Sequence, residues 1–217
     1  MKGTSDIMDA AIVKIISKMQ PSVIFDYGCG DTELTWKVAA LGHKVTGFDV
    51  SDDAILRQRS KRMTPTVEFL TAAQYSKAKG ALRSKYDVVL CSLVLCVIED
   101  IDEVEEVVGN IRDLLHDGGL AIIGFCNPLY MKCCESEIQV KMVPPGKAYS
   151  DCFGYDKTVK STGRSRRDYH RPIRTYEDLF EKAGFQVLDV AQTEGVTPDS
   201  KRVSDFIIYT MKKGERP

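Results

Sequence analysis

The first fifty residues contain a group of side chains with the types and spacing of a nucleotide site. An apolar run, residues 23–25, leads into Asp26 and a turn formed by Gly28 and Gly30. Glycines permit a sharp turn and close approach of a ligand, and the N-terminus of a following helix offers free N–H groups. The next apolar run ends beside Asp49, whose carboxylate can accept hydrogen bonds from a ribose diol. Charge-assisted bonds of this type contribute about 1.5–3 kcal/mol each.

Two nucleotide cofactors use such a layout, and the charges distinguish them. A dinucleotide site needs a third glycine three residues after Gly30, where this chain has Glu33, which would repel a pyrophosphate. S-adenosylmethionine has no phosphate and carries an ammonium and a sulfonium, which suit Asp26. We therefore expect S-adenosylmethionine, with S-adenosylhomocysteine as its product. A purely structural strand–turn–helix without a ligand is the alternative.

The elements that position these residues follow from apolar periodicity. Runs of strand length alternate with helix-period segments, which indicates βαβ units and a mostly parallel sheet covered on both faces. The runs are residues 23–25, 45–50, 67–70, 86–91, 120–126, 185–190 and 205–210.

Three helices are predicted, two of them from the capping and stop residues at their ends. Asp100 is expected to cap a helix that Gly118 ends, and Thr175 a second helix that Gly184 ends. An amphipathic helix within residues 1–20 is expected to cap the cofactor.

These motifs together resemble the class I S-adenosylmethionine-dependent methyltransferases, small-molecule enzymes in particular. The resemblance covers roughly residues 20–126 and 172–211. It implies a doubly wound α/β fold with a seven-stranded, mostly parallel, Rossmann-like sheet, a single domain over 1–217, and a lid insertion after strand 5 at residues 127–174. The motifs that carry it are Asp26-x-Gly28-x-Gly30, Asp49, Tyr86 to Cys91, Asp117 to Leu120, and Ala183-Gly184-Phe185.

The resemblance also implies which residues bind the cofactor. Thr32 stands where the family usually has a third glycine, and Ala73 where many relatives have an acidic residue. The expected cofactor residues are Asp26, Tyr27, Gly28, Cys29, Gly30, Thr32, Asp49, Val50, Ala72, Ala73, Cys91, Ser92 and Leu93.

The acceptor side is expected to come from the 127–174 insertion. His170 is the best candidate for a general base, because a histidine titrates near neutrality. A histidine that only bonds a loop carbonyl is an equal alternative. The expected acceptor-binding residues are Tyr149, Tyr155, Tyr169 and Arg171, although the tyrosines could instead fasten the insertion to the core.

Composition limits the remaining choices. The 217 residues have a formal net charge of −1, and no apolar run is long enough to span a membrane. The seven cysteines lack metal-ligand spacing, so we expect no metal, and their odd number favours the reducing cytosol.

The chain is expected to methylate O, N or S of a small molecule. Two alternatives stay open: a tRNA methyltransferase that uses basic residues within 157–174, and a non-catalytic cofactor-binding partner subunit.

Overall fold

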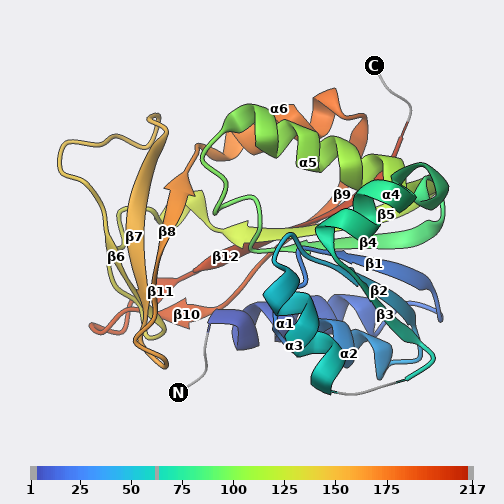
Figure 1. The fold of residues 1–217 in the computed structure, drawn as a ribbon. Helices are drawn as coiled ribbons and strands as arrows, with labels where there is room; N and C mark the ends of the chain where they lie inside the picture. The colour runs from blue at the N-terminus through green and yellow to red at the C-terminus, as the bar shows by residue number, and fades with distance from the viewer. Residues whose placement is uncertain (1–3, 62–63, 215–217) are drawn as a thin grey trace.

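A seven-stranded sheet forms the centre of the molecule in a computed structural model that describes residues 4–61 and 64–214 (Figure 1). The strand order is β3-β2-β1-β4-β5-β12-β9, and only β12 runs antiparallel to its neighbours. The doubly wound, mostly parallel sheet predicted from the sequence is confirmed. The strands are β1 (Val23–Tyr27), β2 (Lys44–Phe48), β3 (Val67–Leu70), β4 (Tyr86–Ser92), β5 (Leu115–Cys126), β9 (Phe185–Gln192) and β12 (Phe206–Lys213).

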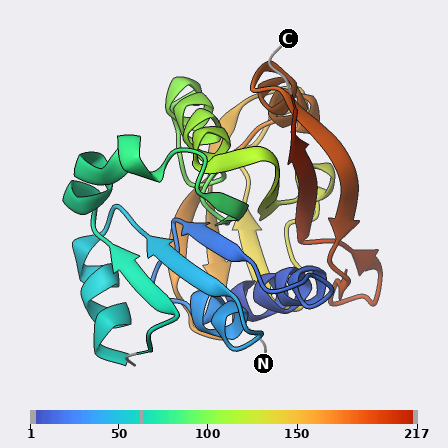
Figure 2. The same ribbon diagram turned by 90° about the vertical axis from the view of Figure 1, so that its right-hand side faces the viewer.

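Helices cover both faces of this sheet, which explains the continuous apolar character of its central strands (Figures 1 and 2). Phe25, Val89 and Ile123 are completely buried between the layers. On one face lie α1 (Thr4–Ile16), α2 (Leu34–Ala39) and α3 (Asp52–Lys61), and on the other α4 (Ala72–Leu82), α5 (Ile101–Leu114) and α6 (Ile173–Lys182).

The N-terminal helix packs a continuous apolar face on the core. Met8, Ile12 and Ile16 of α1 are fully buried, so its buried face has the predicted helical period. Residues 1–3 of the predicted cap helix lie outside the described residues. Within the described ranges, no helix combines the length and apolar character needed to cross a membrane.

Two of the four predicted helix boundaries are right and two are wrong. Asp100 caps α5 as expected, accepting a bond of 3.0 Å from the Asp102 N–H. However, α5 ends at Leu114, because Leu115 already pairs with β4, and Gly118 lies inside β5. The predicted stop at Gly118 therefore comes too late.

The start of α6 was also misplaced. The helix begins at Ile173 after Pro172, and Thr175 lies inside its first turn. The reason is tertiary, because the Tyr149 hydroxyl accepts the Ile173 N–H at 2.9 Å, which satisfies a helix-end donor without a Thr175 cap. Gly184, in the left-handed region at φ +75°, follows the end of α6 as predicted.

The 127–174 insertion is more regular than its sequence indicated. After the short helix η1 (Pro128–Tyr130), it forms an antiparallel sheet of β6 (Gln139–Met142), β7 (Phe153–Val159) and β8 (Ser165–His170). This second sheet stands at one end of the molecule, beyond the end of β5 (Figure 1). A two-stranded hairpin of β10 (Gly195–Val196) and β11 (Arg202–Val203) precedes β12.

Candidate functional site

A cavity of about 710 Å³ opens at the carboxyl ends of β1 and β4. The strand order reverses between these two strands, which is where ligands bind in open α/β sheets. The volume is typical of small-molecule sites, which span about 300–1,000 Å³. Most of the predicted cofactor residues line it: Asp26, Tyr27, Gly28, Cys29, Gly30, Thr32, Asp49, Val50, Ser92 and Leu93.

Asp26 supplies a buried negative group with spare hydrogen-bonding capacity. It is 1% exposed, and its Oδ2 accepts a 2.6 Å bond from the Thr35 hydroxyl. Its Oδ1 is buried without a hydrogen-bond partner in the described structure. Burial raises the pKa of Asp26 to about 7, against the opposing effect of the Thr35 bond. An unpartnered carboxylate oxygen on a ligand cavity fits a cationic group such as an ammonium.

Asp49 organises the glycine turn as well as facing the cavity. Its Oδ2 accepts the Gly30 N–H and its Oδ1 accepts the Ser51 N–H, each at 2.8 Å. Each carboxylate oxygen can accept a second bond, so these contacts leave capacity for a ribose diol. Next to it, Val50 is 78% exposed and lines the cavity, which suits an apolar contact with a flat ring.

The turn itself is shaped by close packing. Gly28 has φ +77°, and a Cβ built there would lie 2.3 Å from Cγ2 of Val94. On the β4 side, Leu93 adopts φ +59° and donates its N–H to the Gly124 carbonyl at 2.8 Å. Backbone strain of this kind concentrates at functional sites. The two loops therefore meet where only glycine fits.

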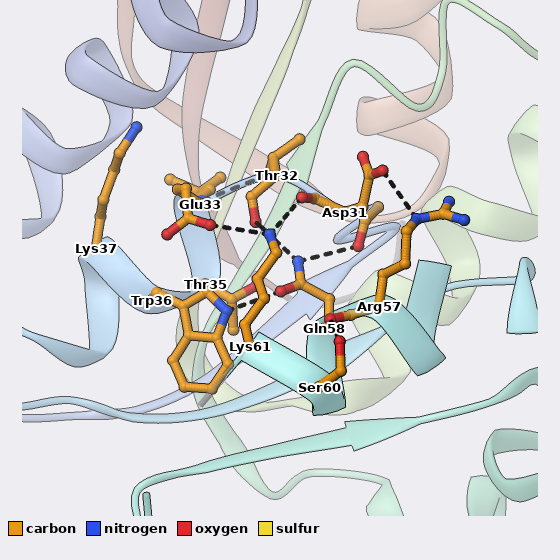
Figure 3. Close-up of polar contacts among 12 residues, drawn as sticks. Asp31, Thr32, Glu33, Thr35, Trp36, Lys37, Arg57, Gln58, Ser60 and Lys61 are labelled. Atoms are coloured by element: carbon orange, nitrogen blue, oxygen red, sulfur yellow. Dashed lines mark hydrogen bonds and ion pairs between the residues drawn. The ribbon is translucent and has the colours of Figure 1, made fainter. Parts of the chain in front are cut away.

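A polar network from α3 holds the glycine loop from below (Figure 3). The buried Gln58 amide donates to the carbonyls of Gly30 and Thr32, at 3.1 and 2.8 Å, and accepts from Trp36 Nε1 at 2.7 Å. Lys61 Nζ adds a bond to the Asp31 carbonyl and an ion pair with Glu33. The position of Glu33 in the sequence argues against a dinucleotide site, and in the structure its carboxylate pairs with Lys61.

Three predicted cofactor residues do not line the cavity. Ala72 and Ala73 form the first turn of α4, which Thr71 caps with a reciprocal bond to Gln74. Cys91 is completely buried within β4. Their assignment to the cofactor therefore remains a prediction.

The predicted acceptor residues are not brought to the cavity either. His170 is 3% exposed, and its Nε2 lies 2.9 Å from the Tyr149 carbonyl, the structural role weighed as its alternative. Burial lowers the pKa of His170. Tyr155 is buried, and the Tyr169 hydroxyl bonds Glu99 at 3.0 Å. Arg171 donates to the carbonyls of Leu95, Ile98 and Glu99.

The insertion reaches the cavity instead through the tip of its β7–β8 hairpin. These residues were missed, although the basic cluster and the turn at Gly163 pointed to this segment. The residues are Val159, Thr162, Arg164, Ser165 and Arg166. Helix α5 adds Glu103, Glu106, Val107 and Asn110 to the lining.

One buried polar cluster was not visible as a sequence motif. Cys96, Cys126 and Asp168 bring ligand-type atoms within 4.8 Å of one another. Lys157 Nζ lies 3.1 Å from Cys126 Sγ and bonds Asp168 Oδ2, and its side chain is fully buried. The Lys157 ammonium therefore occupies the position that a metal cation bound by these side chains would take.

The sequence of this chain is similar to those of known methyltransferases. The methyltransferase-domain family model matches residues 25–121, which span β1 to β5. A ubiquinone biosynthesis O-methyltransferase from Glaesserella parasuis is 29% identical over 132 residues, covering 57% of this chain. The matched stretch spans only 55% of that relative's length.

Solved structures agree on the fold across nearly the whole chain. A protein from Listeria monocytogenes assigned as an S-adenosylmethionine-dependent methyltransferase superposes with a TM-score of 0.65, at 24% identity over 95% of this chain and 100% of that one. The 1,6-didemethyltoxoflavin-N1-methyltransferase of Burkholderia thailandensis, solved with S-adenosylhomocysteine, gives 0.64 at 18% identity over 98% and 80%. The chain thus matches the methyltransferase-domain family over residues 25–121 and shares the fold of solved S-adenosylmethionine-dependent methyltransferases.

Proposed function

We propose that this protein transfers a methyl group from S-adenosylmethionine to O, N or S of a small-molecule acceptor. The observation that carries the proposal is one continuous cavity. It joins the Asp26 and Asp49 carboxylates at the strand ends to the tip of the β7–β8 hairpin. The curated relative acts as an O-methyltransferase in ubiquinone biosynthesis, and the Burkholderia protein as an N-methyltransferase. Both are consistent with a small acceptor.

The chain's own residues would bind and align the reactants. Asp26 Oδ1 would accept from the ammonium of the methionine end, and Asp49 from the ribose hydroxyls. The bound cofactor supplies an activated methyl group on its sulfonium. Alignment of a nucleophile with such a group can account for about 7–11 kcal/mol of barrier lowering in favourable cases. None of the predicted acceptor residues lines the cavity, so we assign no general base.

A tRNA acceptor is not favoured, because most basic side chains of residues 157–174 are already engaged. Lys160 pairs with Glu135, Arg167 with Asp156, and Arg174 with Asp178. Non-specific nucleic-acid binding needs cations that are free to neutralise phosphates.

The cysteines are free thiols, which supports the expected cytosolic location.

Calorimetric titration with S-adenosylmethionine and S-adenosylhomocysteine tests the proposal, with NAD as the control. Micromolar binding of the first two and none of NAD is expected. A screen with labelled S-adenosylmethionine against small hydroxyl, amine and thiol compounds then tests turnover. Binding of NAD alone would overturn the cofactor assignment. Cofactor binding, with transfer to tRNA and to no small compound, would overturn the acceptor class.

A further inference from the structure

Seven basic residues lie within 157–174, and six of them have partners in the protein. Lys157 and Arg166 pair with Asp168, Lys160 with Glu135, Arg167 with Asp156, and Arg174 with Asp178, while Arg171 donates to backbone carbonyls. Of the seven, Arg164 and Arg166 line the cavity. Within the described ranges, the Arg164 side chain has neither an ion pair nor a hydrogen bond to the protein. The cavity therefore receives one arginine without a partner, Arg164, and one that is held by a single carboxylate, Arg166.

Arg166 is aimed by a buried ion-pair chain. Side chains alternate along β8, so Arg166 and Asp168 share its inward face. Arg166 Nε lies 3.0 Å from Asp168 Oδ1, while Asp168 Oδ2 bonds Lys157 Nζ. Asp168 and Lys157 are fully buried, which fixes their geometry. The Nη2 of Arg166 is buried without a hydrogen-bond partner in the described structure.

This cluster carries more positive than negative charge. A single carboxylate, Asp168, lies against the two cations Lys157 and Arg166. A hydrogen bond from Cys96 lowers the pKa of the buried Cys126 thiol, burial opposes that shift, and the Lys157 ammonium lowers the pKa further. The hairpin end of the cavity thus favours a negative group.

The opposite wall has the reverse charge. Asp26, Asp49, Glu103 and Glu106 come from the strand ends and α5. That wall suits the cationic groups of the cofactor. The cavity lining also contains apolar side chains: Val94, Val97, Ile98, Val107 and Val159. A ligand complementary to the hairpin end would combine an apolar body with an anion.

We infer that the methyl acceptor carries a carboxylate or phosphate group, which Arg164 and Arg166 bind at the hairpin end of the cavity. Arginine is suited to this role because its planar fork pairs with both groups through two parallel bonds. Asp168 and Lys157 act as positioning residues for Arg166. The inference rests on the proposed function. The carboxylate of the cofactor is a second source of the same chemistry, and the experiment must separate the two.

The first measurement uses matched probes that differ in charge. Protein saturated with S-adenosylhomocysteine is titrated with benzoate and phenyl phosphate, and with neutral benzamide as the control. The acids are expected to bind at least tenfold more tightly than benzamide. Benzamide binding as tightly as both acids would overturn the inference.

The second measurement uses four variants. Arg166→Gln and Arg164→Gln should each weaken phenyl phosphate binding at least tenfold. Arg167→Gln, on the exposed outward face of the same strand, should change it less than twofold. Arg166→Lys keeps the charge without the fork and should fall between Arg166→Gln and the wild type. Arg164 is exposed, so its variant tests the site even if Arg166→Gln fails to fold. Equal losses in all three glutamine variants, or none in any, would overturn the assignment.

A third measurement separates the two carboxylate sources. S-adenosylhomocysteine carries the amino-acid carboxylate, and 5′-methylthioadenosine lacks it. Unchanged affinity for both in Arg166→Gln and Arg164→Gln supports the acceptor site. Weakened binding of S-adenosylhomocysteine alone would assign the arginines to the cofactor, which overturns the inference and leaves the proposed function intact. If the wild type binds neither nucleoside, the proposed function fails, and the charge preference is read from phenyl phosphate and benzamide on the protein alone.

Discussion

The two walls of the cavity are built in different ways. The strand-end wall comes from short stretches of chain, residues 26–32, 49–50 and 92–94, whose positions are fixed by backbone turns and carboxylates. The hairpin wall comes from side chains that reach the cavity only because β7 and β8 pair and Lys157 pairs with Asp168. The first wall is a local property of the chain, whereas the second depends on tertiary structure. Substitutions in the two walls should therefore fail in different ways.

The largest expected effect is on the strand-end wall at Asp26. Asp26→Asn keeps the shape and can still accept from Thr35, but it presents an amide to a cationic ligand. We expect affinity for S-adenosylmethionine to fall about 100-fold, in line with the ~1.5–3 kcal/mol of a charge-assisted bond. Calorimetry measures this. An affinity within threefold of the wild type would contradict the ammonium assignment.

The raised pKa of Asp26 adds a pH dependence with a defined sign. Below about pH 7 the ligand-free carboxyl is largely protonated, so affinity should rise with pH through 7 and binding should release a proton. The folded protein holds that proton above the unfolded pKa near 3.8, so this group's contribution to stability is lost as pH rises through 7. Asp26→Asn should thus raise the melting temperature of the ligand-free protein more at pH 8 than at pH 4. Titration in two buffers of different ionisation enthalpy detects the proton, which the variant should not release.

The glycine turn tests close packing in the same wall. Gly28→Ala forces an alanine to φ +77° and against Val94, and we expect it to cost about 1–3 kcal/mol of unfolding free energy and to weaken cofactor binding. Gly42 is the matched control, because it also has positive φ, +94°, but has no atom within 4 Å of a Cβ built there. Gly42→Ala should cost less, and Val94→Ala should recover part of the loss in Gly28→Ala. Equal costs at Gly28 and Gly42 would show that only the dihedral angle matters.

The same contrast explains what the sequence could predict. The succession of strands along the chain and the residues around Asp26, Gly28 and Asp49 follow from apolar runs and a local turn motif, and the structure places these three residues on one cavity. The antiparallel sheet of the insertion was not foreseen. Its β8 strand, Ser165–His170, is mostly charged or polar, so its alternation has no apolar face to reveal it.

The predicted acceptor residues lie outside the cavity lining for a related reason. Tyr155 and His170 have the residue types expected of a pocket, and they share the inward face of the β7–β8 hairpin with Arg166. They pack against the core, while Arg166 lies nearer the tip, which reaches the cavity. Only residues near the turn of the hairpin reach the cavity. The sequence marks that turn only by Gly163.

A smaller effect is expected at Asp49. Asp49→Ala removes the proposed ribose acceptor and two bonds to backbone N–H groups, of Gly30 and Ser51. We expect affinity for S-adenosylhomocysteine to fall at least tenfold. Asp52→Ala, an exposed carboxylate at the start of α3, controls for net charge and should change the affinity less than twofold. Asp49→Asn should recover part of the loss, since its amide oxygen still accepts one bond. Wild-type affinity in Asp49→Ala would reject the ribose assignment.

The smallest effect on turnover is expected at His170, although the sequence suggested a general base there. The ring is buried between Tyr149 and Phe153, outside the cavity lining, and its Nε2 lies 2.9 Å from a backbone carbonyl. His170→Ala should therefore leave kcat within about twofold and cofactor affinity unchanged, while it lowers the melting temperature. Loss of a buried hydrogen bond and of ring packing costs about 1–3 kcal/mol. His170→Gln, which can still donate to the Tyr149 carbonyl, should recover part of the stability. Suppose instead that both variants lost about 100-fold in kcat, kept normal melting temperatures and changed the acidic limb of the pH–rate profile. His170 would then be the base. The functional residues of the hairpin wall, like those of the strand-end wall, could in that case be predicted from residue type alone.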